Sequence, residues 1–254
     1  MQGRGGFYEE VGTLRDVVQN HMLQVIALLA MDAPAGRDTQ SVRPEKLRLF
    51  RAMRPMEPAQ AVRGQFRGYR DEKGVAADSQ VETFAALCLH IDTWRWGGVP
   101  FYIRAGKCLP ITTTEVRVNM KCPPLAIFDE ISPATSNYFR FRLSPEVTIS
   151  AGARVKQHGE DMCGQPVELI ACHEPPGEDL PYERLLRDAL CGDPALFTRD
   201  DSMEAAWRVI DPVLGHATPV QEYEPGSWGP PAAADIVVGG AGWHDPRPEE
   251  WIPC

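Results

Sequence analysis

The chain has 254 residues, 43% of them hydrophobic, and a formal net charge of −9 at pH 7. This length allows one large domain or two small ones with a substantial apolar core. The acidic balance argues against a nucleic-acid or membrane surface, because both usually require a basic face.

No stretch holds the roughly 20 apolar residues that a membrane-spanning helix needs. No basic segment followed by an apolar run marks a secretion signal. The seven cysteines are odd in number and include no CxxC pair, which favours reduced thiols over a disulfide framework. We therefore expect a cytoplasmic protein.

The first predicted helix contains the best candidate for a functional site. Three glycines before it are expected to form a turn: Gly3, Gly5 and Gly6. Apolar residues then recur at helical spacing over residues 13–31, with Gly12 or Thr13 as the N-cap. The second half is apolar nearly all round and should be buried, whereas the first half carries Asp16 and His21. These two lie about 140° apart around an α-helix, so they cannot pair closely but could line one pocket.

The middle of the chain alternates between helix and strand patterns. An amphipathic helix is predicted over residues 41–56 with Ser41 as its cap, and a strand, a long exposed loop and a return over 62–84. The next strand has one apolar side, formed by Leu87, Leu89 and Ile91. A short strand over 101–104 follows, with Lys107 projecting from its end.

Four further strands are predicted at residues 114–120, 137–143, 147–151 and 167–172. Their short connections favour an antiparallel or mixed sheet over an array of βαβ units. Helical periodicity returns from Tyr182 and again from Ser202, and a Pro/Gly-rich arm with aromatic anchors begins at Thr218. The pattern predicts an α+β fold with helices at both ends of the sequence and a large sheet between them. We expect one domain over residues 1–230 and an extended tail over 231–254.

Three other sets of residues have alternative interpretations. Four residues could suggest zinc, but their spacings of five, nine and one match no recognised finger, so we expect no metal site: His158, Cys163, Cys172 and His173. Four arginines on predicted strands form either an anion pocket or a salt-bridged face: Arg104, Arg117, Arg140 and Arg142. Three tryptophans are expected in the core or an interface: Trp94, Trp96 and Trp207.

Four separated segments carry a family resemblance: RGGFYEEVGTLRDVVQNHMLQ from Arg4, VETFAALCLHIDTWRWGGVPFYIRAGKCLP from Val81, PYERLLRDALCGDPALFTRDDSMEAAWRVIDPVL from Pro181, and YEPGSWGP from Tyr223. In this order they closely resemble the C-terminal domain of glucose-6-phosphate dehydrogenases. The resemblance implies an extensive, mostly antiparallel sheet with helices on one face and the other face used for dimerisation. It also implies oxidation of glucose 6-phosphate to 6-phosphogluconolactone with NADP, in the pentose phosphate pathway.

The resemblance also implies residue roles. His21 would be the base that removes the sugar's hydroxyl proton as hydride leaves for the nicotinamide, a task that suits a neutral imidazole. Asp16 would hydrogen-bond the sugar hydroxyls, and Lys107 would reach the anionic substrate. A second basic residue of some members is replaced by Thr112.

A second, structural NADP of some eukaryotic relatives is not expected in this chain. Arg117 and Arg142 match positions that contact it there, but Thr113 stands where such relatives carry a lysine.

The family's dinucleotide-binding half has no counterpart in this sequence. No strand leads through a GxGxxG-like turn into a helix, and the segments that supply the substrate-phosphate ligands and the carboxylate orienting the histidine are missing. We expect NADP to be bound mainly by that N-terminal domain and the chain alone to be inactive. The expected partners are glucose 6-phosphate and either a second copy through the sheet face or a dinucleotide-binding half. The alternative is a truncated, non-catalytic paralogue that acts as a dimerisation or sugar-phosphate-binding module.

Overall fold

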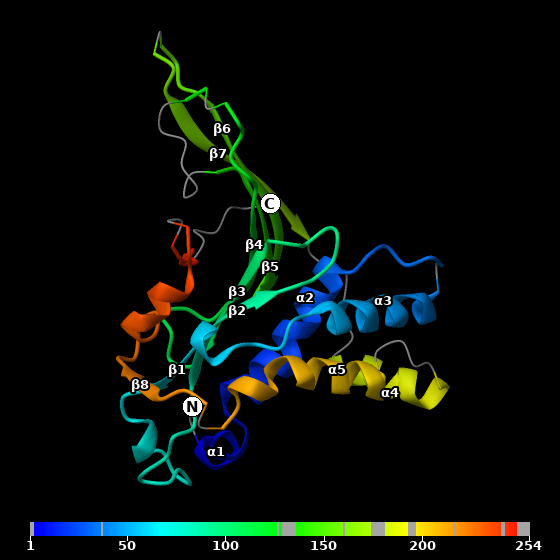
Figure 1. The fold of residues 1–254 in the computed structure, drawn as a ribbon, viewed down its shortest axis with the longest axis vertical. Helices are drawn as coiled ribbons and strands as arrows, with labels where there is room; N and C mark the ends of the chain where they lie inside the picture. The colour runs from blue at the N-terminus through cyan, green and yellow to red at the C-terminus, as the bar shows by residue number, and fades with distance from the viewer. Residues whose placement is uncertain are drawn as a thin grey trace. The chain divides into compact units, whose positions relative to one another are not determined.

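The computed structural model describes residues 3–36, 38–125, 127–128, 136–159, 161–173, 181–192, 197–215, 217–239 and 242–247. Their contacts form two compact units (Figure 1). The first comprises Met1–Leu109 and Glu178–Ile236, and the second comprises Pro110–Gly177 and Val237–Cys254. The expected boundary at residue 230 stays a prediction. None of the helices in the described ranges is long and apolar enough to span a bilayer.

The first unit contains the helices and one sheet. Its helices are α1 (Gly5–Thr13), the π-helix η1 (Leu14–Met22), α2 (Leu23–Ala30), α3 (Thr39–Ala52), α4 (Pro181–Cys191) and α5 (Asp200–Ile210). Its strands are β1 (Ala61–Phe66), β2 (Phe84–His90), β3 (Pro100–Gly106) and β8 (Val220–Tyr223). Short 3-10 helices are η2 (Pro58–Gln60), η3 (Tyr69–Asp71), η5 (Asp211–Val213) and η6 (Pro231–Ile236). The strand order is β3-β2-β1-β8, with β8 parallel to β1 and the other pairs antiparallel.

The core of this unit lies between the sheet and its helices. The predicted apolar side of β2 and the residue after it is confirmed, because Leu87, Leu89 and Ile91 are fully buried against the helix layer. They pack in one cluster with residues of η1, α2, α3 and α5, such as Val18 and Val209. Trp96 and Trp207 pack against this cluster as expected, whereas Trp94 is fully exposed in the structure.

Two expected helix starts are corrected. Gly5 and Gly6 lie inside α1 and not in a turn before it. In α3 the cap is Asp38, whose carboxylate accepts the backbone N–H of Ser41 at 2.9 Å, so Ser41 belongs to the first turn. Asp38 accepts the N–H of the residue three positions later, which is the usual bond of an N-cap residue.

The second unit is built on an antiparallel sheet in the order β4-β5-β6-β7. Its strands are β4 (Thr114–Asn119), β5 (Tyr138–Ser144), β6 (Val147–Lys156) and β7 (Gly164–His173). The α+β class and the mostly antiparallel pairing are confirmed, but the strands form two four-stranded sheets. After β3 the backbone turns at Cys108, which has a positive φ of 53°, and Pro110 cannot donate to a ladder.

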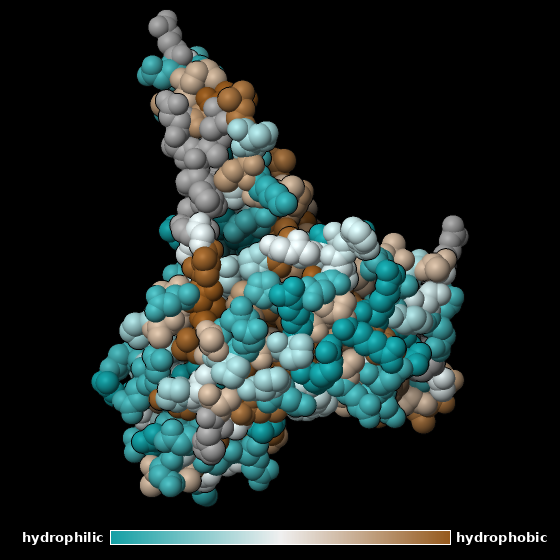
Figure 2. All heavy atoms as spheres, viewed as in Figure 1, coloured by the Kyte–Doolittle hydropathy of each residue, from teal (hydrophilic) through white to brown (hydrophobic). Residues whose placement is uncertain are grey.

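The two faces of the second sheet differ in an unusual way. The register places apolar side chains on one face, including Phe139, Ile149, Val167 and Leu169, and all four are exposed. On the opposite face, Arg142, Thr148 and Ser150 are buried. Figure 2 shows hydrophobic residues reaching the surface on this part of the molecule. We call the residues Phe139, Leu143, Val147, Ile149, Val155, Val167 and Leu169 the apolar face.

The cysteines follow the expectation in part. Five of those described are free thiols: Cys88, Cys108, Cys122, Cys163 and Cys191. Cys172 is disulfide-bonded, which corrects the expectation of reduced thiols alone. The register pairs Lys156 with Gly164 and Val147 with His173. Cys163 and Cys172 therefore lie near opposite ends of the β6–β7 hairpin, about 30 Å apart for nine residues of strand, too far to share a metal ion.

Candidate functional site

The segment that carries Asp16 and His21 is a π-helix, η1. At its end the N–H of Leu23 donates to the carbonyl of Val18, five residues earlier. In this i to i−5 pattern, residues five apart lie one turn apart on the same side of the helix, and such turns are frequent at functional sites. This corrects the separation of about 140° that α-helical geometry predicts for Asp16 and His21. Both side chains belong to one side of η1.

A break at Gly12 defines where η1 begins. Gly12 has φ 66° and ψ 175°, so the backbone leaves the helix there and a new helix starts after it. Neither Gly12 nor Thr13 provides a side-chain cap; Thr13 Oγ1 instead lies 2.7 Å from the hydroxyl of Tyr8. The caps come from Glu82, whose carbonyl accepts the N–H of Thr13 at 3.0 Å and whose Oε1 accepts that of Leu14 at 3.1 Å.

Lys107 lies next to Asp16, as a shared site requires. It follows the last residue of β3, and its Nζ is 4.0 Å from Asp16 Oδ2. The side chains are 37% and 29% exposed. The same ammonium is 4.9 Å from the centre of the Tyr8 ring, a cation–π contact. A partly exposed ion pair at this distance is weak, so both groups can exchange this contact for a ligand.

The backbone of Lys107 is held by the Tyr223 hydroxyl and the Thr83 carbonyl. Tyr223 donates its hydroxyl to the main-chain carbonyl of Lys107 at 2.7 Å, while the N–H of Lys107 donates to the carbonyl of Thr83 at 2.8 Å. Burial raises the pKa of Tyr8 and of Tyr223, so both phenols stay protonated. Sequence reasoning missed Tyr8, Glu82 and Tyr223, because their roles depend on contacts between distant segments and have no local pattern.

His21 is exposed at the end of η1. Within the described residues its hydrogen-bond contact is with Asn20, whose Nδ2 is 3.4 Å from His21 Nε2. An imidazole with an open edge can accept a proton from a bound hydroxyl near neutral pH. The structure therefore brings Asp16 and Lys107 into contact and sets His21 on the same helix, one π-turn away.

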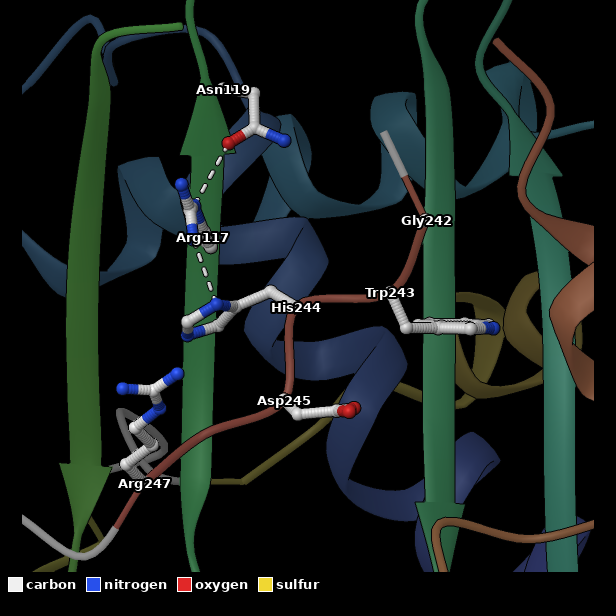
Figure 3. Close-up of a pocket in the computed structure, with 7 residues that line it drawn as sticks. All are labelled: Arg117, Asn119, Gly242, Trp243, His244, Asp245 and Arg247. Atoms are coloured by element: carbon white, nitrogen blue, oxygen red, sulfur yellow. Dashed lines mark hydrogen bonds between the residues drawn. The ribbon is translucent and has the colours of Figure 1, made fainter. Parts of the chain in front are cut away.

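A pocket lies in the second unit (Figure 3). It has a volume of about 410 Å³ and is lined by Arg117, Asn119, Gly242, Trp243, His244, Asp245 and Arg247. Arg117 donates to Asn119 Oδ1 at 2.9 Å, is 2.7 Å from His244 Nδ1, and stacks on the Tyr138 ring at 4.0 Å.

The four strand arginines do not form one anion pocket. Arg104 stacks on Trp228 in the first unit, at 4.4 Å from the ring centre. Arg140 and Arg142 form ion pairs on the buried face of the second sheet, with Glu115 as a shared partner. The alternative of a salt-bridged strand face is thus confirmed for these two.

Glu115 is the centre of this charged network. Its side chain is 3% exposed, with Arg142 Nη2 at 3.2 Å and His244 Nε2 at 2.9 Å. Burial pushes the pKa of Glu115 up, but the hydrogen bond and charge of His244, the charge of Arg140 and the hydrogen bond from Arg142 outweigh it and hold the pKa below its ordinary value.

We expect acid to destabilise the second unit through Glu115. The folded state holds this proton less tightly than the unfolded chain, so stability is present above the ordinary pKa of 4.5 and is lost as the pH falls through and below it. The midpoint of thermal unfolding, followed by circular dichroism, should fall between pH 7 and pH 4 more in the unmodified chain than in Glu115→Gln. The exposed Glu146→Gln is the matched control; an equal acid-induced fall in Glu115→Gln would contradict the role of Glu115.

Comparison with known sequences decides the family. The sequence model of the glucose-6-phosphate dehydrogenase C-terminal domain matches residues 1–244. The chain belongs to this family. Glucose-6-phosphate 1-dehydrogenase 1 of Mycobacterium tuberculosis is 42% identical over 256 residues, which cover 100% of this chain and 53% of that protein. The chain spans about half the length of the curated relatives that it matches.

Solved structures of glucose-6-phosphate dehydrogenases share this fold. The crystal structure of glucose-6-phosphate 1-dehydrogenase from Mycobacterium avium has a TM-score of 0.88 at 41% identity, covering 100% of this chain and 54% of that one. A glucose-6-phosphate dehydrogenase in complex with its substrate glucose-6-phosphate has a TM-score of 0.82 at 31% identity, covering 96% and 53%. The family expected from the sequence is confirmed.

Proposed function

We propose that the chain is the substrate-binding part of a glucose-6-phosphate dehydrogenase, which oxidises glucose 6-phosphate to 6-phosphogluconolactone with NADP. The observation that carries this proposal is the juxtaposition of Asp16 and Lys107, with His21 on the same helix, in a chain of this family. An ammonium suits an anionic, hydroxyl-rich ligand, and a carboxylate suits the sugar hydroxyls.

His21 is the base in this proposal. Its neutral ring removes the proton of the anomeric hydroxyl, while Asp16 accepts hydrogen bonds from the sugar and Lys107 donates to it. The Lys107 ammonium already faces Asp16 across 4.0 Å, so a ligand hydroxyl can bridge the two groups. The geometry supports positioning and proton removal by this chain.

NADP, the hydride acceptor of the proposed reaction, does not fit the described residues as a resident cofactor. None of the glycines in the described ranges lies in a phosphate-binding turn between a strand and a helix, which dinucleotides require. We therefore assign NADP to a dinucleotide-binding half that the described residues do not form. The chain alone is then inactive in oxidation, and we place it in the cytoplasm with that half.

Dimerisation through the apolar face is part of the same proposal. Its exposed side chains include Leu169 at 75% and Ile149 at 50%. Contiguous apolar surface of this kind on a sheet favours a protein partner over water. A second copy presents the same face and can bury it in a symmetric contact. This face also favours the second candidate function, a non-catalytic dimerisation module, which the following experiment separates from the first.

Binding of glucose 6-phosphate at millimolar concentration tests the proposed function. We expect chemical-shift changes at residues of η1 and at Lys107 in the unmodified chain. Lys107→Ala should raise the dissociation constant about 10- to 100-fold, since it removes a charge-assisted hydrogen bond. Lys73→Ala, an exposed lysine of the same unit, is the control and should leave binding unchanged. If the unmodified chain shows no binding, the dimerisation module becomes the better description.

A further inference from the structure

We propose that Glu82 is a positioning residue of the site: it determines where η1 begins, and thereby where Asp16 stands relative to Lys107. This inference rests on the proposed function. Glu82 is buried in the loop before β2 and touches neither Asp16 nor Lys107 in any hydrogen bond or ion pair described. It acts through two backbone segments: the start of η1, which precedes Asp16, and the end of β3, which precedes Lys107.

Glu82 contacts the start of η1. The first N–H groups of a helix have no partners within the helix and carry its positive dipole end. Glu82 supplies two acceptors to them, its carbonyl for Thr13 and its Oε1 for Leu14. Asp16 follows two residues after Leu14, so these two hydrogen bonds fix the helical turn that carries Asp16.

The Glu82 carboxylate is held in one position by its ion pair with Arg63. Its Oε2 accepts from Arg63 Nη2 at 2.7 Å and from Arg63 Nε at 3.2 Å, inside the core. Arg63 donates further to the carbonyls of Gln80 at 2.9 Å and Thr218 at 2.8 Å. A buried ion pair whose hydrogen bonds are satisfied in this way has one geometry, because any displacement leaves a buried charge without a partner.

The loop that carries Glu82 also contacts Lys107. The residue after Glu82 is Thr83, and its carbonyl accepts the N–H of Lys107. Two consecutive residues therefore hold both members of the pair, one through the start of η1 and the other through the end of β3. A shift of Glu82 changes the separation between Asp16 and Lys107 without removing either side chain.

Gly12 completes the arrangement. A Cβ at this position would lie 2.5 Å from Glu82 Oε1, in addition to the strain of a φ of +66°. Gly98 has a similar φ of +79°, and a Cβ added there would meet no atom within 4 Å. Gly12→Ala therefore displaces the carboxylate, whereas Gly98→Ala also places an alanine at a positive φ but meets no neighbouring atom.

The decisive experiment compares Gly12→Ala with Gly98→Ala. We expect Gly12→Ala to raise the dissociation constant for glucose 6-phosphate about tenfold and to speed hydrogen exchange of the Leu14 amide about tenfold. Gly98→Ala should change each by less than about twofold. Faster exchange of the Leu14 amide with unchanged ligand affinity would overturn the proposal.

The double variant Arg63→Met/Glu82→Leu is the second test. It removes both buried charges together, which a core tolerates better than the loss of one. We expect the same tenfold loss of affinity, whereas Val209→Ala, a core change in α5, should lower the unfolding midpoint and leave affinity unchanged. Unchanged affinity in the double variant would overturn the proposal.

A readout without ligand separates this inference from the proposed function. Nuclear Overhauser contacts between the Asp16 and Lys107 side chains report the separation of the pair. These contacts should weaken in Gly12→Ala and stay unchanged in Gly98→Ala, even if the unmodified chain binds no glucose 6-phosphate. Unchanged contacts in Gly12→Ala would overturn the positioning role itself.

Discussion

Replacing His21 with asparagine is expected to lower kcat about 10²- to 10⁴-fold, the usual contribution of a positioned general base. Asparagine keeps a polar side chain of similar size but cannot take a proton. The dissociation constant for glucose 6-phosphate should stay within about threefold, because the proposed site binds this ligand through Asp16 and Lys107. A large effect on kcat with a small effect on binding is the signature of a base.

The measurement uses the chain mixed with a separately produced dinucleotide-binding half of a close relative. NADP reduction is followed by the absorbance of the reduced nicotinamide, with the chain alone as reference. His158→Asn, an exposed histidine of the second unit, is the control and should keep full activity. Equal loss of binding and turnover in His21→Asn would assign the residue to binding, and a normal rate from the chain alone would contradict the need for a second half.

A charge on the apolar face is expected to abolish dimerisation. Leu169 is 75% exposed and lies opposite Ala151 in the register, near the middle of β7. In a dimer that buries this face, Leu169→Arg would place an unpaired charge in an apolar contact, which costs several kcal/mol. The dimer dissociation constant should rise at least about a thousandfold.

Sedimentation at several micromolar concentrations measures this change. The control is Leu190→Arg on α4, where the leucine is 89% exposed and belongs to the first unit. That variant should dimerise like the unmodified chain. A monomeric unmodified chain, or a dimer that survives Leu169→Arg, would show that a different surface or partner covers the apolar face.

Strand positions and the α+β class could be predicted from the sequence because they depend on local patterns. The alternation around Leu87 and Leu89 indicates a half-buried strand wherever it occurs. Between the two sheets the backbone turns at Cys108, a non-glycine residue with a positive φ, and no local pattern predicts that conformation there. The burial of Arg142 in the second sheet likewise depends on its ion pair with Glu115, which lies 27 residues earlier in the sequence.

The candidate site could be predicted only through family resemblance. Asp16 and Lys107 are far apart in the sequence, and periodicity cannot bring them together. The expected relation of Asp16 to His21 is wrong because it rests on α-helical winding, and η1 is wider. The capping contacts of Glu82 could not be predicted either, because 68 residues separate Glu82 from Leu14.

The wide turn of η1 determines which chain lengths keep the site intact. A π-helix holds one residue more per hydrogen-bonded ring than an α-helix. Deleting one residue between Asp16 and His21 would restore ordinary α-helical winding and leave the buried stretch of α2 free to pack as before. The two side chains would then be four residues apart, a spacing that an α-helix also places on one face. Among related chains, a spacing of four on an α-helix is therefore expected to serve the site as well as a spacing of five on a π-helix.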